Sequence, residues 1–237
     1  YGGDRWHKAK QRQTKFDSWS PSLMPIGARV VSALFSRYLP LIFREDPMPR
    51  ALVIVDVQPT FCEGGALPVE GGNACAQRVA DFVAAHASDY DCIVTSQDWH
   101  IDPGSHFSDN PDFVDTWPPH GVAGTVEAEL HPALANLDAD VTIHKGMYEA
   151  AYSAFDGEDV ATKRPLLDLL RDKGIDSLDV VGLAQSHCVC ETALDGVKDG
   201  FKVRVFTDLT EPVSPELGEL AAARMAEAGV ELVPSQA

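Results

Sequence analysis

The chain has 237 residues, 45% of them hydrophobic, which predicts one main globular domain with a sizeable core. Its net charge of −17 argues against nucleic acid as a partner, because an acidic body repels phosphate backbones. No apolar run reaches the roughly 20 residues that a bilayer span needs, so we expect no membrane partner and interpret the acidity as a solvated surface.

Residues 1–47 are predicted to be an N-terminal extension. They carry +4 against −21 for the rest of the chain, show little hydrophobic periodicity, and end before Met48, which directly precedes a strong strand. We therefore expect a natural start at Met48, a main domain over residues 48–237, and an extension that is poorly ordered or non-native. The alternative is an arm that packs on a neighbouring subunit, because Val30–Phe43 is apolar enough to be buried. A homo-oligomer is thus left open.

From residue 51 onward, predicted strands alternate with predicted helices. Short apolar runs predict buried strands, and apolar residues at helical spacing predict helices. The predicted strands span residues 51–56, 92–96, 140–144, 178–184, 202–207 and 231–234. The predicted helices span residues 73–87, 165–173, 188–198 and 216–228. This alternation predicts an α/β fold with a parallel-stranded sheet and helices on both faces, in three layers.

Ligands of such sheets bind outside the carboxyl ends of the strands. That rule selects Asp56, residues 98–106, Lys145 and residues 185–188. The stretch from 99 to 124, rich in Pro, Asp and His, is a candidate functional loop because loops of that length are otherwise uncommon.

Cys188 is the candidate nucleophile. It follows an apolar strand and opens a predicted helix, whose free N–H groups and partial positive charge would lower a thiol pKa and could form an oxyanion hole. A buried, inert cysteine is the alternative. Asp56 could equally cap a turn, and Lys145 could be a solvated surface lysine. Together the three would place a base, a cation and a thiol at one rim.

Asp98, His100, His106 and His120 form a second constellation within one loop region. Three imidazoles and one carboxylate suit a divalent transition metal, with water filling further positions. Any one of these histidines alone would more simply be structural.

Five cysteines are an odd number, which indicates reduced thiols in a cytoplasmic protein. We expect that Cys62, Cys75, Cys92 and Cys190 form no disulfide and are not catalytic.

Five blocks of sequence, in order, resemble the nicotinamidases of the isochorismatase-like hydrolase superfamily. The blocks are Ala51-Leu-Val-Ile-Val-Asp-Val-Gln58 with Phe61-Cys-Glu-Gly-Gly65, Asp98-Trp-His100 with His106-Phe107, Trp117-Pro-Pro-His120 with Gly124-Thr125, Lys145-Gly-Met-Tyr148 with Tyr152-Ser153 and Phe155, and Val181-Gly-Leu-Ala184 with His187-Cys-Val189. They cover about residues 49–235, so the resemblance extends over the whole predicted domain.

The resemblance implies an amidase that converts nicotinamide to nicotinate and ammonia. It implies a triad of Asp56, Lys145 and Cys188, with the N–H groups of Ala184 and Cys188 as the oxyanion hole and a cis Leu183-Ala184 peptide. It also implies one metal (zinc, iron or manganese) that binds the pyridine nitrogen of the substrate and is held by Asp98, His100, His106 and His120. The residues implied to flank the ring are Phe61, Trp117 and Tyr152.

Three departures from the family pattern concern the surroundings of these residues. Pro59-Thr60 stands where Asn-Asp is common, Gly121 replaces a frequent Cys, and Gln185-Ser186 replaces a frequent Thr-Asp. The departures concern substrate preference rather than the reaction class. Two alternatives to nicotinamide hydrolysis are also left open: an amidase acting on a carbamoyl or ureido substrate, and a non-enzymatic ligand-binding relative.

Overall fold

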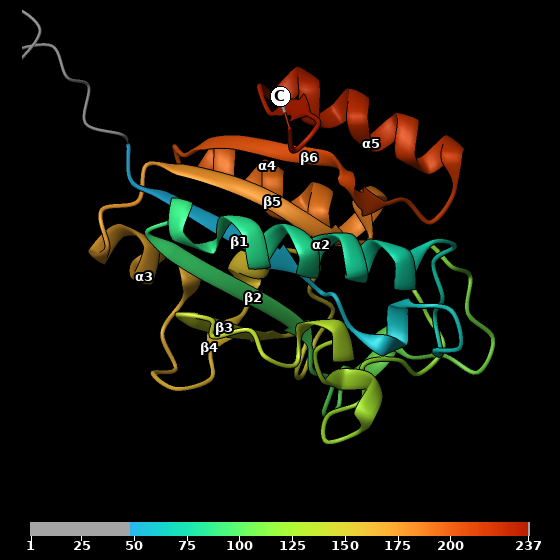
Figure 1. The fold of residues 1–237 in the computed structure, drawn as a ribbon. Helices are drawn as coiled ribbons and strands as arrows, with labels where there is room; N and C mark the ends of the chain where they lie inside the picture. The colour runs from blue at the N-terminus through green and yellow to red at the C-terminus, as the bar shows by residue number, and fades with distance from the viewer. Residues whose placement is uncertain (1–47, 237) are drawn as a thin grey trace, which may run out of the picture. The chain divides into compact units, whose positions relative to one another are not determined.

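A seven-stranded sheet forms the centre of the computed structural model, which describes residues 48–236 (Figure 1). The predictions made for residues 1–47 lie outside the described residues. The strands are β1 (Arg50–Val55), β2 (Cys92–Asp98), β3 (Val141–Lys145), β4 (Glu158–Asp159), β5 (Ser177–Leu183), β6 (Lys202–Glu211) and β7 (Glu231–Val233). Their order is β4-β3-β2-β1-β5-β6-β7, and every neighbouring pair is parallel except β3 and β4. The predicted α/β class is therefore confirmed.

Helices cover both faces of this sheet. The helices are α2 (Gly72–His86), α3 (Leu166–Asp172), α4 (Cys190–Lys198) and α5 (Pro215–Ala228). Alternate residues of β1 explain the layering, because Val53 packs with the helices α3, α4 and α5 whereas Leu52 and Ile54 pack with α2. Since both faces of β1 are buried, the strand is apolar throughout, as its unbroken apolar run predicts.

Three details differ from the sequence prediction. β4 is only two residues long, too short to leave a hydrophobic pattern. β6 continues to Glu211, beyond the predicted end at Thr207, and its pairing with β5 shifts register between Val180 and Gly182. The helical segment that contains Cys188 begins earlier than predicted, with a π turn at Gln185–Val189 that leads into α4.

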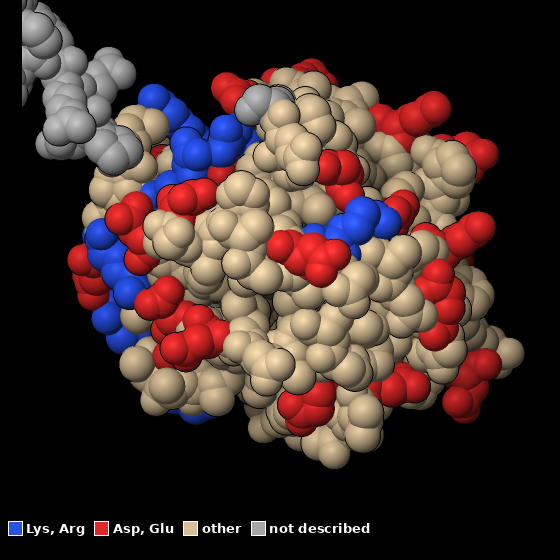
Figure 2. All heavy atoms as spheres, viewed as in Figure 1, with Lys and Arg blue, Asp and Glu red and all other residues tan. Residues whose placement is uncertain are grey.

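On the face shown in Figure 2, Asp and Glu side chains are spread among neutral residues and do not form one dominant cluster, as expected for a solvated surface. Within residues 48–236, none of the helices combines the length and the apolar character required to cross a bilayer.

Gly182 allows β5 to approach β1 closely beside the predicted site. It lies opposite Val55 in the strand pairing and has φ +113°, and an added β-carbon would collide with the Val55 backbone. Asp56 follows Val55 directly, so this close approach fixes the end of β1 against β5.

Replacing Gly182 with alanine is therefore expected to destabilise the fold by about 3 kcal/mol or more, through overpacking and a strained backbone. Gly174 is the matched control, because it also has positive φ (+69°) but its β-carbon would meet no atom within 4 Å. Gly174→Ala should cost only about 1–2 kcal/mol. Denaturant unfolding measures the free energy of unfolding of both variants. Equal losses of this free energy would contradict the importance of the close contact between the Gly182 and Val55 backbones.

Candidate active site

Four polar side chains lie where neighbouring parallel strands end. Asp56 follows β1, and Asp98 and Lys145 are the last residues of β2 and β3. Cys188 lies in the π turn after β5. Because β3, β2, β1 and β5 are successive neighbours, their carboxyl ends meet at one rim, where ligands of α/β sheets bind.

Lys145 is the centre of this group and is only 1% exposed. Its Nζ lies 2.9 Å from Asp56 Oδ2 and donates a hydrogen bond to Asp98 Oδ1. Nζ also donates to the Ala151 carbonyl at 3.1 Å and to Cys188 Sγ at 3.7 Å. The alternative of a solvated surface lysine is therefore wrong.

The buried charges are arranged around this ammonium group. Burial alone would lower the pKa of Lys145, but Asp56 and Asp98 outweigh it and raise that pKa well above its usual range. Burial would raise the pKa of Asp98, but Lys145 and the imidazoles of His100 and His120 hold it well below its usual range. Asp98 and Lys145 are thus an ion pair.

The pKa of Asp56 is raised, whereas that of Asp98 is lowered. Burial raises the pKa of Asp56, Lys145 opposes that rise, and the charge of Asp98 adds to it. Its Oδ1 accepts a hydrogen bond from Ser96 Oγ at 2.7 Å, and its Oδ2 lies 2.9 Å from Lys145 Nζ. A buried carboxylate with a raised pKa is suited to take up a proton.

The pKa of Cys188 is raised well above its usual value, which corrects the expectation of a lowered one. Burial is the largest cause; Lys145 opposes it, and the carboxylates of Asp56 and Asp98 reinforce it. One cation faces two carboxylates, so a third negative charge is unfavourable. The resting nucleophile is therefore a thiol, and ionising it requires a nearby base.

The π turn presents Cys188 to this group. The Ala184 carbonyl accepts the N–H groups of His187 at 3.0 Å and Val189 at 3.2 Å, which fixes the start of the turn. The peptide between Leu183 and Ala184 is cis, as expected. Ala184 directly precedes this turn, and Cys188 lies within it. That their N–H groups form the oxyanion hole stays a prediction.

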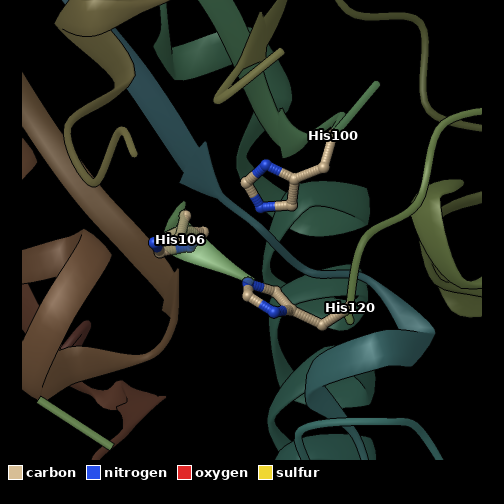
Figure 3. Close-up of side chains that lie close together, drawn as sticks. All are labelled: His100, His106 and His120. Atoms are coloured by element: carbon tan, nitrogen blue, oxygen red, sulfur yellow. The ribbon is translucent and has the colours of Figure 1, made fainter. Parts of the chain in front are cut away.

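Three imidazoles converge beside the ion pair (Figure 3). His100, His106 and His120 each offer one ring nitrogen, and these atoms all lie within 4.8 Å of one another. All three residues are buried. Asp98 Oδ2 lies 3.5 Å from His100 Nε2 and 3.6 Å from His120 Nε2, so the carboxylate that pairs with Lys145 also faces this cluster.

The protonation of these rings fits a divalent metal. His100 Nδ1 lies 2.6 Å from the Gly146 carbonyl and His120 Nδ1 lies 2.8 Å from the Pro118 carbonyl. Carbonyl oxygens only accept hydrogen bonds, so each Nδ1 carries a proton, and a neutral ring then has at Nε2 the lone pair that a metal ligand needs. Burial and the neighbouring imidazoles lower the pKa of His106 to about 4, which keeps it neutral.

Two of these ring nitrogens are buried without a partner. His100 Nε2 and His106 Nδ1 make no hydrogen bond with any described residue. Buried polar atoms are rarely left unpaired. A metal ion, which accepts electron pairs from ring nitrogens, would satisfy both of these atoms.

A pocket opens between the thiol and the imidazoles. Phe61, Trp117 and Tyr152 line it, together with Cys188 and Ala184. Trp117 Nε1 donates to Tyr152 Oη at 2.9 Å, which holds these two aromatic walls together. The three residues expected to flank a planar ring thus surround one space.

Residues 50–237 match the isochorismatase domain family. The chain belongs to that family. It is 49% identical over 186 residues to a nicotinamidase/pyrazinamidase of Mycobacterium tuberculosis, covering 78% of this chain and 99% of the relative. The pyrazinamidase of Pyrococcus horikoshii, solved in complex with zinc, has TM-score 0.67 and 32% identity over 78% of this chain and 98% of that one. PnC1 of L. infantum, solved with nicotinate, has TM-score 0.68 and 31% identity over 80% and 94%.

Membership of the isochorismatase family confirms the predicted resemblance. One departure from the family pattern now has a physical reason. Gly121, in place of a frequent Cys, has φ +51°, and an added β-carbon would lie 2.9 Å from Asp98 Cβ. A side chain at this position would therefore press on a candidate metal ligand.

Several residues of the site were missed by the sequence analysis. The buried Gln58 side chain accepts from the Asp98 N–H at 2.8 Å and donates to the Asp98 carbonyl at 3.0 Å, so it fixes this residue from both sides. Ser96, near the end of β2, holds Asp56. The ring of His187, to which the sequence analysis gave no role, lines the pocket, and its centroid lies 5.6 Å from that of Trp117.

All five cysteines are free and buried, which confirms the expectation of no disulfides. Burial raises the pKa of Cys62, Cys92 and Cys190 each to about 11 and that of Cys75 to about 12. These four thiols are therefore protonated and poorly reactive.

Proposed function

We propose that this chain is a metal-containing cysteine amidohydrolase that converts nicotinamide to nicotinate and ammonia, and acts likewise on pyrazinamide. The observation that carries the proposal is the buried group of Asp56, Lys145 and Cys188, whose thiol lines the same pocket as His106 and His120 of the three converging imidazoles. The 49% identity to a protein named nicotinamidase/pyrazinamidase supports this substrate class.

In the first half of the reaction, Asp56 takes the thiol proton of Cys188. The transfer moves a proton between two groups of the same buried site, so its total charge is unchanged, and Lys145 stabilises the thiolate. The thiolate attacks the amide carbon, and the N–H groups of Ala184 and Cys188 stabilise the oxyanion. The carbon–nitrogen bond then breaks as Asp56 returns the proton to the leaving nitrogen, which releases ammonia and leaves a thioester.

In the second half, water attacks the thioester. Asp56 accepts a proton from this water, and the carbon–sulfur bond breaks to release the acid. The proton passes from Asp56 to the Cys188 sulfur, which restores the resting thiol. Every proton in this scheme is carried by Asp56, whose raised pKa suits both taking and returning it.

Asp98, His100, His106 and His120 would hold one divalent transition metal: zinc, iron or manganese. Bound there, the metal would supply a Lewis acid for the ring nitrogen of the substrate. Phe61, Trp117 and Tyr152 would hold the ring by its faces and edges, and so place the amide group at Cys188.

Removing the metal is expected to raise the KM for nicotinamide about tenfold or more, while the protein stays folded. The fold should persist because Asp98 is the last residue of β2 and the three histidines lie in the loop region that follows it, at the rim of the sheet. The measurement combines elemental analysis, thermal melting and steady-state kinetics before and after chelation. Full activity in a protein free of transition metals would contradict the metal site.

An ammonia-release assay separates the candidate functions. Nicotinamide and pyrazinamide should be hydrolysed, and a carbamoyl or ureido substrate should not, because only a pyridine or pyrazine ring offers a nitrogen to the imidazole cluster. Turnover of the ureido substrate alone would favour the other amidase, and no turnover of any substrate would favour a binding protein.

All of these residues lie between 48 and 237, so we propose that this range forms the hydrolase domain. Five free cysteines support a reducing compartment, the cytoplasm, as its location.

A further inference from the structure

Thr60 is a fully buried threonine beside the pocket. It lies in the short turn Pro59–Phe61 after β1, and its exposed fraction is 0%. Its neighbour Phe61 lines the pocket, but Thr60 itself does not. A hydroxyl that is fully buried and does not line the pocket needs a separate explanation.

The hydroxyl of Thr60 links two segments that are far apart in sequence. The Gly121 N–H donates to Thr60 Oγ1 at 3.1 Å, and this bond is buried. Thr60 Oγ1 in turn donates to Glu127 Oε2 at 3.1 Å, and the Ala66 N–H donates to the same oxygen at 3.3 Å. Because a carboxylate oxygen only accepts, the hydroxyl proton points to Glu127 and an oxygen lone pair faces Gly121.

Gly121 contacts three of the four candidate metal ligands through its backbone. Its N–H belongs to the peptide bond with His120, and its carbonyl accepts the His100 N–H at 2.9 Å. Its α-carbon lies so close to Asp98 that a β-carbon would be 2.9 Å from Asp98 Cβ. The position of this one peptide therefore affects how His100, His120 and Asp98 face one another.

We propose that Thr60 is a positioning residue for the metal centre, and that Glu127 orients its hydroxyl. Thr60 fixes the Gly121 peptide by accepting its N–H, and this peptide in turn fixes the backbone of the ligands His100 and His120. The inference rests on the proposed metal site and adds to it which residues maintain its geometry.

Thr60→Val removes the hydroxyl while keeping the shape of the side chain. It leaves the buried Gly121 N–H without an acceptor, so the peptide is expected to shift toward another partner. The dissociation constant for Zn²⁺ should rise about 10- to 100-fold, the usual effect of losing a residue that supports metal ligands. Thr60→Ser keeps the hydroxyl and should restore the affinity to within about threefold of wild type.

Thr192 supplies the matched control. It is also 0% exposed, and its Oγ1 also accepts a backbone N–H, that of Ala154 at 3.0 Å. Thr192→Val therefore leaves the same kind of buried amide unpaired, but it is that of Ala154 in the short turn Ala154–Asp156, which makes no hydrogen bond to the imidazoles. It should lower the melting temperature and leave the Zn²⁺ affinity unchanged.

The experiment strips the four proteins of metal and titrates each with Zn²⁺ in competition with a chromogenic chelator. A large loss of affinity in Thr60→Val alone supports the proposal. An unchanged affinity in Thr60→Val, or an equal loss in Thr192→Val, overturns it. A wild-type protein that binds neither Zn²⁺ nor Mn²⁺ overturns the metal site together with this inference, so the two failures are distinguishable.

Glu127→Ala provides a second test if Thr60→Val does not fold, because Glu127 is partly exposed. It removes the acceptor that directs the Thr60 hydroxyl, and the Zn²⁺ dissociation constant should rise about three- to tenfold. An unchanged Zn²⁺ affinity in this variant would contradict the orienting role of Glu127 and, with it, the proposed chain of hydrogen bonds from Glu127 through Thr60 to Gly121.

Discussion

Replacing Cys188 with alanine is expected to lower kcat for nicotinamide by about four orders of magnitude or more. The sulfur is the only protein atom in the scheme that forms a covalent bond with the substrate, and alanine offers no replacement. The fold should persist, because the change removes one atom from the wall of a pocket and leaves the π turn and its Ala184 anchor in place. Binding of nicotinamide should also persist, which equilibrium titration can measure.

Cys190 is the control for this variant. It lies two residues further on and is equally a buried, free thiol, but its Sγ faces the Ala221 carbonyl at 3.9 Å within the core beneath α5. Cys190→Ala should lose some stability, about 1 kcal/mol, and keep its activity. Ammonia release by a folded Cys188→Ala protein above about 1% of the wild-type rate would contradict the covalent mechanism.

Asp56→Asn is expected to lower kcat by about 10²- to 10⁴-fold, the usual contribution of a general base. The amide cannot take the Cys188 proton, and the thiol has a raised pKa, so the reactive thiolate becomes scarce. Asparagine suits the backbone at this position, because Asp56 has φ +46° and asparagine adopts the left-handed region readily. Lys145 keeps its partner Asp98, so no buried cation is left unpaired.

Asp179 provides a matched control for the loss of a buried carboxylate. It is 1% exposed and accepts two hydrogen bonds from Arg204, both of 2.7 Å, on β5 and away from the pocket. Asp179→Asn should lower the melting temperature and leave kcat close to wild type. If Asp56→Asn keeps wild-type kcat, or if both variants lose activity equally, Asp56 is not the base.

The sequence predicted the sheet because its strands are apolar on both faces and its helices are amphipathic. The rule that ligands bind at the carboxyl ends of strands then selected Asp56 and Lys145 without any structural information. The imidazoles could be grouped because His100, His106 and His120 fall within one loop region. In each case the signal is local in sequence, or follows from a general property of parallel sheets.

What could not be predicted depends on contacts between distant segments. The raised pKa of Cys188 follows from the burial of its thiol and from the nearby carboxylates of Asp56 and Asp98, and no local sequence pattern shows either. Gln58 and Thr60 look like ordinary polar residues after a strand, and only the folded chain brings them to Asp98 and Gly121. Only the last two residues of the π turn, Cys188 and Val189, were predicted as helical, as the start of an α-helix, because the sequence spacing of the two kinds of helix is nearly the same.

The central claim is that a thioester forms on Cys188 during hydrolysis of nicotinamide. Rapid acid quenching of the working enzyme, followed by peptide mass spectrometry, tests it most directly. We expect a nicotinoyl group on the peptide that contains Cys188, formed before nicotinate accumulates and absent from Cys188→Ala. Nicotinate and ammonia appearing without any acylated cysteine, or with the acyl group on another residue, would contradict the account.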